Sequence, residues 1–376
     1  MKRCFKKCNP KPITLSSQAH SRLPRQSVRH TNRSSLRHTR GYNLSELSHR
    51  ASCFYKGITE RIKMAAEVFR DIEGLHLGKH FPDDAVLSAI AYKPRPADIF
   101  LAGYPKSGST WTHRIIYNIL MDAEDPKEPL DYFIRLPCIE LQGAEAALYA
   151  PKPSAFKTHL PFNKTPYAPE AKYVCIARNP YDTCVSFYYH TKHMPAYKFD
   201  TATFDEFFEL FLQGRVDYGD YFENVMSWYR QRNEPNVLFL TYEELKKDTR
   251  GHVLKIAAFL GPEREKKLKE NPELLERIIE KTSLENMKKV LNFNGHQHTM
   301  LDESMLERVR PELKKGLGTL LDFIKVPMTG DFVRKGQVGD WRNHFSPEQI
   351  LRMKEKIAKA TAGSDLMSLW KDVDLP

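Results

Sequence analysis

The sequence has no apolar run of about 20 residues, the length that a helix needs to cross a lipid bilayer. Cysteine is scarce as well: three of the six cysteines lie in the first 63 residues, and Cys138, Cys175 and Cys184 show neither zinc-site spacing nor a disulfide pattern. These absences exclude a protein with a helical membrane span and a small disulfide-stabilised domain. We expect a protein of a reducing compartment, the cytoplasm.

Acidic residues are almost missing from the start of the chain. Residues 1–63 contain 15 Lys and Arg against two Asp and Glu, which gives this stretch a net charge of +13. The whole chain carries +11, so residues 64–376 carry about −2 and are nearly neutral. A nearly neutral body does not offer the basic surface that nucleic acids need, so a cationic site within it must be local.

Residues 1–63 are also poor in apolar side chains, so we expect them to be disordered. Their Ser- and Arg-rich composition is equally typical of an organellar transit peptide, and a third interpretation is that translation starts at Met64. We therefore divide the chain into a basic extension, residues 1–63, and one catalytic domain, residues 64–376.

In the catalytic domain, short apolar runs alternate with helical patterns. Strands are expected after Ala97 and at Ser154–Thr158, Lys172–Ala177 and Asn236–Thr241. Helices are expected at Thr110–Met121, from about Pro180 to His190, at Phe204–Leu212, Tyr221–Arg232 and Glu243–Leu260, and from Pro347. This alternation predicts an α/β fold in which a parallel sheet is covered by helices on both faces.

A glycine loop joins the first of these strands to its helix. Gly103 and Gly108 have the spacing of a phosphate-binding loop, but Ser109 and Thr110 follow directly, without the lysine that an ATP-binding loop places before its hydroxyl residue. A lysine lies inside the loop instead, at Lys106. The pattern favours a loop that holds phosphate by other means than a kinase does, although an ordinary strand-to-helix turn also contains glycines.

Side chains suited to catalysis or to phosphate binding follow two further strands. Lys157 and His159 alternate along an extended segment, so both point to the same side and offer a cation and a base to one site. Arg178 follows the strand at Lys172–Ala177 and is suited to binding a phosphate. A packed structural histidine and a helix-capping arginine are the alternatives for His159 and Arg178.

A third cationic segment, Arg334-Lys335-Gly336, lies far along the chain, where glycines let the backbone approach an anion. A basic surface loop is the alternative interpretation. Together with the glycine loop and Arg178, this segment gives at least three groups directed at phosphate. A nucleotide with phosphates at both its 5′ and 3′ positions would need them all.

Four segments resemble the cytosolic sulfotransferases, in that family's order, over roughly residues 75–345. They are Tyr104-Pro105-Lys106-Ser107-Gly108-Ser109-Thr110-Trp111, Lys157-Thr158-His159-Leu160-Pro161, Ala177-Arg178-Asn179-Pro180 with Ser186, and Arg334-Lys335-Gly336 with Gly339-Asp340-Trp341. The resemblance implies a P-loop-like core. It also implies transfer of a sulfuryl group from 3′-phosphoadenosine 5′-phosphosulfate (PAPS) to a hydroxyl or amine of a small molecule, without a metal.

The resemblance also implies roles for individual residues. The 5′-phosphosulfate would be held by Lys106, Ser107, Gly108, Ser109, Thr110 and Trp111, with Trp111 also against the adenine. The 3′-phosphate would be bound by Arg178, Ser186, Arg334, Lys335 and Gly336, and further nucleotide contacts would come from Tyr242, Thr282 and Phe332. The catalytic set would be His159 as general base, with Lys106, Lys157 and Ser186.

Two other functions fit parts of the sequence, and one segment differs from the pattern of the sulfotransferases. A P-loop kinase is disfavoured by the missing lysine, and a nucleic-acid-binding protein that uses the basic extension is disfavoured by the nearly neutral body. The family's dimer motif has Thr-Val where this chain has Ser346-Pro347, which puts dimerisation by that route in doubt. We expect an aromatic or hydrophobic acceptor, bound by loops at Leu75–Tyr92, Arg135–Tyr149 and Tyr188–Tyr197.

Overall fold

The computed structural model describes residues 68–128, 130–292 and 303–376 of the chain. These residues belong to one compact unit. The basic extension, with its predicted disorder, lies outside the described residues. Among the described helices, none is both long and apolar enough to cross a membrane.

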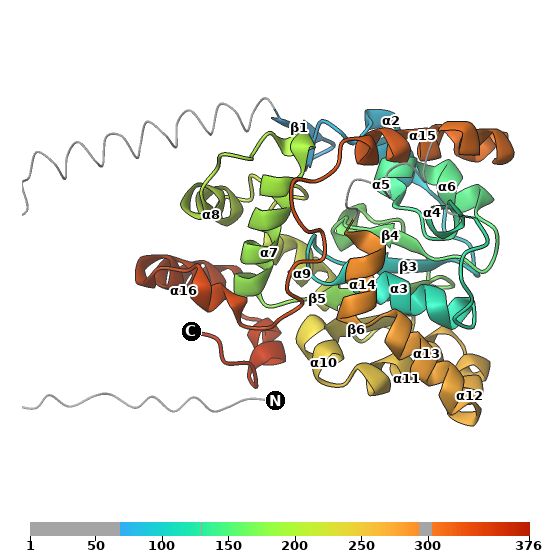
Figure 1. The fold of residues 1–376 in the computed structure, drawn as a ribbon. Coiled ribbons are helices and arrows are strands. Elements are labelled where there is room, and N and C mark those ends of the chain that lie inside the picture. Colours follow the sequence, from blue (N-terminus) through green and yellow to red (C-terminus); the bar gives the residue numbers. More distant parts are fainter. Residues whose placement is uncertain (1–67, 129, 293–302) are drawn as a thin grey trace, which may run out of the picture. The chain divides into compact units, whose positions relative to one another are not determined.

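A parallel sheet forms the centre of the fold (Figure 1). Within the described residues it has four strands in the order β4-β3-β5-β6. They are β3 (Ile99–Ala102), β4 (Phe156–Thr158), β5 (Lys172–Ala177) and β6 (Val237–Thr241). In register, Phe100 of β3 pairs with Phe156 of β4 on one side and with Tyr173 of β5 on the other. All four strands lie where the apolar runs predicted them, and the predicted α/β class is confirmed.

Alternating strand residues enter two separate cores, because successive side chains of a strand point to opposite faces. Leu101 and Val174 pack with residues of α3 (Ser109–Leu120), α11 (Thr249–Leu260) and α13 (Pro272–Lys281). Phe100 and Tyr173 pack instead with residues of α2 (Asp83–Ala91), α5 (Ile139–Gln142), α6 (Ala144–Tyr149) and α9 (Tyr221–Tyr229). Both faces of the sheet are therefore covered by helices.

The fold contains one further hairpin and eight further α-helices among the described residues. They are the hairpin β1 (Phe69–Ile72) and β2 (Leu75–Gly78), and the helices α4 (Asp131–Arg135), α7 (Pro180–His193), α8 (Phe204–Leu212), α10 (Tyr242–Lys247), α12 (Pro262–Glu270), α14 (Leu284–Leu291), α15 (Pro311–Lys325) and α16 (Pro347–Ala360). In Figure 1, α2, α5, α6 and α15 lie above the sheet as drawn, and α10 to α13 lie below it.

Two helix starts follow directly from local sequence. The Asn179 side chain accepts a hydrogen bond from the backbone N–H of Asp182, and Pro180 takes the first helical position of α7. Ser346 and Gln349 form a capping box at the start of α16, where Pro347 is again the first residue. The Ser346-Pro347 pair thus begins a helix in this chain.

Two sequence predictions are wrong in detail, and one element was not predicted. The helix expected at Glu243–Leu260 is two helices, α10 and α11, because Asp248 ends the first and caps the second by accepting a hydrogen bond from the Gly251 N–H. The segment from residue 64 to 96 was not expected to contain the β1–β2 hairpin. The stretches expected to be acceptor-binding loops contain β2, α2, α5, α6 and the end of α7.

Candidate active site

The four parallel strands end at one edge of the sheet, which is where α/β proteins bind their ligands. Each strand end delivers a residue that the sequence singled out. Lys106 follows β3, His159 follows β4, Arg178 follows β5, and Tyr242 begins α10 directly after β6. Segments far apart in the sequence are therefore brought to one place by the topology of the sheet.

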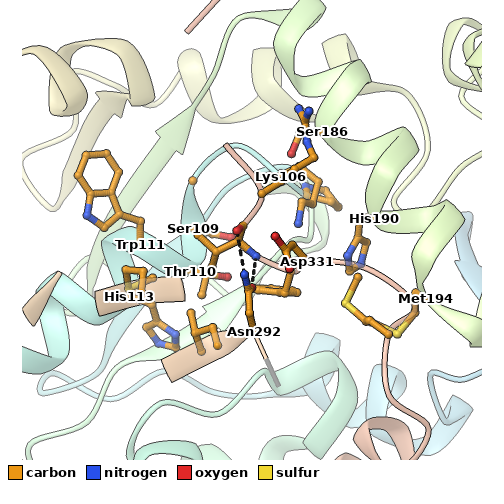
Figure 2. A pocket seen from close by; sticks show the side chains of 18 of the residues that line it. Lys106, Ser109, Thr110, Trp111, His113, Ser186, His190, Met194, Asn292 and Asp331 are labelled. Carbon is orange, nitrogen blue, oxygen red and sulfur yellow. Dashed lines mark hydrogen bonds between the residues drawn. The ribbon is translucent and has the colours of Figure 1, made fainter. Parts of the chain in front are cut away.

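A cavity of about 800 Å³ opens at this edge. It is lined by fifteen of the predicted residues, Lys106, Gly108, Ser109, Thr110, Trp111, Lys157, His159, Arg178, Ser186, Tyr242, Thr282, Phe332, Arg334, Lys335 and Gly336. Figure 2 shows Trp111 and His190 on opposite sides of this pocket, with Lys106 and Asn292 between them. Ser107 is the exception: it is fully buried beneath the loop, and its hydroxyl has no hydrogen-bond partner among the described residues.

The glycine loop has the backbone shape of an anion cradle. Lys106 and Gly108 both have positive φ, 68° and 103°, and α3 begins immediately afterwards at Ser109. A Cβ atom at Gly108 would lie 2.8 Å from the Tyr242 ring, so this position needs glycine for space as well as for its backbone angle. The free N–H groups of the first turn of α3 therefore face the cavity, where they favour a negatively charged group.

Lys106 lies in a strongly cationic environment. Burial, together with the charges of Lys157, Arg178 and Arg334, lowers the pKa of Lys106 to about 7. Its ammonium group lies 4.5 Å from the centre of the Phe332 ring. Four cationic groups around one cavity repel one another, and a bound polyanion would relieve that repulsion.

This pKa predicts how the affinity for an anionic nucleotide changes with pH. Lys106 is protonated below about pH 7 in the free protein, and phosphate beside it raises its pKa, so above pH 7 binding must take up a proton. The affinity for adenosine 3′,5′-bisphosphate (PAP) should therefore be full near pH 7 and fall by up to tenfold per pH unit above it. Calorimetry from about pH 7 to about pH 9 in two buffers measures both the affinity and the proton uptake.

Lys106→Arg provides the control, since a guanidinium keeps its charge over this range and should flatten the pH dependence. An affinity of the unmodified protein that stays constant to about pH 9 would contradict the assignment of a lowered pKa to Lys106.

Arg178 is held by three contacts at the end of β5, one of them an ion pair with Asp182 at 3.7 Å. Its guanidinium group donates a hydrogen bond to the Gln337 carbonyl at 2.7 Å and lies 4.4 Å from the centre of the Tyr242 ring. The side chain is only 9% exposed, and its Nε atom has no partner among the described residues. An arginine fixed in this way, with a free donor, is ready to bind an anion.

The segment Arg334-Lys335-Gly336 lines the cavity beside Arg178, which is hydrogen-bonded to the Gln337 carbonyl of the same loop, but its cations are already paired. Arg334 and Lys335 contact the two oxygens of Asp340 at 2.6 and 2.7 Å, and these ion pairs help to lower the pKa of Asp340. The loop is tied to α7 because Asp182 accepts hydrogen bonds from the backbone N–H groups of Gly339 and Trp341. Asp340 therefore orients both cations without removing them from the cavity.

His159 has the geometry of a base. Its Nδ1 atom is hydrogen-bonded to the Gly103 carbonyl, which places the proton on Nδ1 and leaves the Nε2 lone pair unprotonated. Burial and the charge of Lys157 lower the pKa of His159 to about 3, so the ring is neutral near pH 7. The expected alternation is also found, since Lys157 and His159 are half-buried on the cavity side and Thr158 between them is fully buried.

A buried carboxylate, which the sequence analysis did not single out, fixes this strand end. Glu140 accepts hydrogen bonds from the Thr158 hydroxyl at 2.7 Å and from the His159 N–H at 2.6 Å, and burial raises its pKa. It lies 19 residues from His159 in the sequence, so no local spacing could have indicated the contact.

Two further residues were missed on the nucleotide side. The Lys246 ammonium group lies 5.8 Å from the centre of the Trp111 ring, and its position one helical turn after Tyr242 is a signal that could have found it. Asn292 exchanges two hydrogen bonds with the backbone of Val333, drawn as dashed lines in Figure 2. The latter pairing joins segments 41 residues apart and has no sequence signature.

The fold and the cationic cavity define a nucleotide-dependent α/β transferase. The family model described as the sulfotransferase domain matches residues 96–365. The chain belongs to the sulfotransferase family, and its activity is that of a PAPS-dependent sulfotransferase.

Curated relatives and solved structures agree with this assignment. Human Sulfotransferase 1E1 is 35% identical over 293 residues, 74% of this chain and 88% of the relative. Mouse Sulfotransferase 2B1 is 35% identical over 281 residues, which cover 73% of this chain and 74% of the relative.

Among solved structures, mouse sulfotransferase SULT7A1 complexed with PAP is similar with a TM-score of 0.60 and 28% identity, over 81% of this chain and 98% of that one. Retinol dehydratase in a complex with retinol and PAP is similar with a TM-score of 0.56 and 25% identity, over 78% and 89%.

The cavity fits such a nucleotide. Several buried polar atoms of its lining have no partner among the described residues, and two of them are donors of predicted nucleotide-binding residues, the Arg178 Nε and the Trp111 Nε1. Buried donors that lack a partner are uncommon in folded proteins and are satisfied when a ligand supplies the acceptor.

Proposed function

We propose that this protein transfers the sulfuryl group of PAPS to a hydroxyl, or an amine, of a small hydrophobic and aromatic acceptor, with His159 as the general base. The observation that carries the proposal is the hydrogen bond from His159 Nδ1 to the Gly103 carbonyl. It joins the base to the backbone of the phosphate loop, so that the free Nε2 atom and Lys106 belong to one rigid unit.

The nucleotide would lie across the strand ends. We assign its 5′-phosphosulfate to Lys106, Ser107, Gly108, Ser109, Thr110 and Trp111, its 3′-phosphate to Arg178, Ser186, Arg334, Lys335 and Gly336, and its base to Trp111, Tyr242, Thr282 and Phe332. The positive charges of Lys106, Arg178 and Arg334, which all line the cavity, support this assignment. Ser107 is the one member of these sets that does not line the cavity, since its side chain is fully buried.

PAPS supplies the sulfuryl group and a good leaving group. His159 would hold the acceptor hydroxyl at Nε2 and take its proton as the new bond to sulfur forms. Lys106 and Lys157 would stabilise the negative charge that develops on the transferred group and on the leaving phosphate. We propose that these cations do the work that Mg²⁺ does in ATP-dependent enzymes, so that no metal is needed.

The acceptor side of the cavity is mainly apolar and aromatic. Phe81, Tyr132, Leu141, Met194 and Phe323 line it. These residues come from the stretches that the sequence assigned to the acceptor, apart from Tyr132 and Phe323. A flat hydrophobic acceptor suits such walls, and the relative whose structure contains retinol supports this class.

Ligand stabilisation tests the choice of donor. PAPS or PAP at a hundredfold excess over Kd should stabilise the protein by about 2.7 kcal/mol and raise its Tm, because ligand binding favours the folded state. Mg·ATP at the same concentration should have a much smaller effect, since it lacks a 3′-phosphate for Arg178 and Arg334. Thermal unfolding followed by fluorescence measures both. Equal stabilisation by Mg·ATP would favour a kinase.

A further inference from the structure

The acceptor side of the cavity contains a histidine that the proposed chemistry does not use. His80 lines the cavity just after β2, with its ring stacked on Phe323 at 4.9 Å and edge-on to Tyr197 at 5.1 Å. Both of its ring nitrogens are buried, and neither has a hydrogen-bond partner among the described residues. Such atoms mark a place where a water or a ligand group belongs.

A buried carboxyl group lies beside this histidine. Asp217 is 2% exposed, lines the same cavity, and accepts hydrogen bonds from the Gly78 N–H at 2.6 Å and from the Tyr197 hydroxyl. A Cβ atom at Gly78 would touch both His80 and Asp217, which places the two side chains around one small space. Each carboxyl oxygen keeps a second lone pair for another donor.

This pair lies away from the reacting centre, along one wall. Ring contacts lead from His159 to Tyr218 at 5.3 Å, from Tyr218 to Phe81 at 5.7 Å, and from Phe81 to His80 at 4.4 Å. Tyr218 has a positive φ of 65°, a strained conformation for an aromatic residue, and this backbone angle holds its ring against His159. A rigid molecule of two rings spans such a wall.

We propose that His80 and Asp217 form a distal polar subsite that binds a second, uncharged hydroxyl group of the acceptor while the reacting hydroxyl lies at His159. The inference rests on the proposed function and narrows its substrate class to flat, rigid molecules with hydroxyl groups at both ends. A hydroxyl both donates and accepts, so it suits a neutral imidazole, which has one N–H and one lone pair.

The charges around the subsite favour an uncharged group over an ammonium group. Burial and the charge of Arg70 lower the pKa of His80 to about 4, so the ring is neutral near pH 7. Burial raises the pKa of Asp217 to about 7, so its carboxyl group is only partly ionised there. Figure 2 shows His190 on the wall of the same pocket, and the charges of Lys106 and Lys157 help to lower its pKa. An ammonium group would meet repulsion from Arg70, Lys106 and Lys157, the cations that help to lower the pKa values of these two histidines.

Binding of two matched phenols to the PAP-bound protein tests the subsite. Calorimetry should give a Kd for 4,4′-biphenol at least about tenfold lower than that for 4-phenylphenol. An entirely apolar wall predicts weaker binding of 4,4′-biphenol, because its second hydroxyl would lose its hydrogen bonds to water. The two equivalent hydroxyls of 4,4′-biphenol lower its Kd by a statistical factor of only about two. Equal binding, weaker binding of 4,4′-biphenol, or no binding of either phenol would overturn the proposal. So would tighter binding of 4′-(aminomethyl)biphenyl-4-ol, which carries an ammonium group.

Substitutions assign the preference to the residues named. His80→Phe keeps an aromatic ring but no nitrogens, and should reduce the ratio of the two Kd values to about twofold or less. Asp217→Asn is the second variant and should lower the same ratio. His76→Phe is the matched control, because His76 is a neighbouring histidine stacked on Phe69 and not on the cavity, so the ratio should persist.

A ratio that survives in both His80→Phe and Asp217→Asn would overturn the proposal. The measurement is one of binding, so it separates this inference from the proposed function. A clear preference without sulfuryl transfer to either phenol would leave the subsite standing and would count against the proposed acceptor class.

Discussion

Replacing His159 by alanine should reduce turnover by about 10²–10⁴-fold, while the affinity for PAP stays within a few fold of the unmodified protein. His159 is hydrogen-bonded to the phosphate loop through its Nδ1, and we assign the nucleotide to other side chains, so loss of the ring should remove the base and leave the cations in place. Turnover at saturating PAPS and calorimetry with PAP measure the two quantities separately.

A purely structural role for His159 predicts a different result, in which stability, nucleotide affinity and turnover fall together. His113→Gln is a suitable control, because His113 is also buried, has a pKa lowered to about 3, and is hydrogen-bonded to a carbonyl, that of Ala155. The control should lose stability and keep most of its turnover. A His159→Ala protein that transfers sulfuryl at a near-normal rate would refute the mechanism.

Replacing Lys106 by alanine should weaken PAP binding and also lower turnover at saturating PAPS by about 10²–10³-fold. The lysine lies inside the phosphate loop among Lys157, Arg178 and Arg334, so it would contact the group being transferred in both the ground state and the transition state. Steady-state kinetics with PAPS and calorimetry with PAP check both effects.

Lys335→Ala provides the contrast. Lys335 is 43% exposed and paired with Asp340, and by our assignment it would contact only the 3′-phosphate. Its loss should raise the KM for PAPS with little change in kcat, the signature of lost uniform binding. If Lys106→Ala changed KM alone in the same way, Lys106 would be a binding residue without a catalytic role.

Local patterns in the sequence were enough to predict the strands of the sheet and the positions of Lys157 and His159. Short apolar runs placed all four strands of the sheet, and a strand end has a fixed direction, so the residues that follow the strands could be expected to meet at one edge. The alternation of Lys157 and His159 was enough to predict that both side chains face one side.

Contacts between distant segments had no such signal. The break between α10 and α11 is a different case, because Asp248 caps α11 through Gly251, only three residues away, whereas the apolar periodicity alone predicted one continuous helix. The hydrogen bonds between Asn292 and the Val333 backbone, and the one from the His159 N–H to Glu140, depend on how whole helices pack against the sheet. The pairing of Arg334 and Lys335 with Asp340 was hidden for a different reason, because a charge run in a loop gives no indication of its partners.

The most direct test of the central claim follows the sulfuryl group itself. The protein is incubated with PAPS labelled with sulfur-35 and a panel of phenols, catecholamines, steroids and fatty alcohols, and in parallel with Mg·ATP labelled at its γ-phosphate. We predict that sulfur-35 appears on a flat phenolic acceptor, with one PAP formed for each label transferred, and that ATP transfers no label. Transfer of phosphate from ATP, or the absence of sulfur-35 from every acceptor in the panel, would contradict the claim.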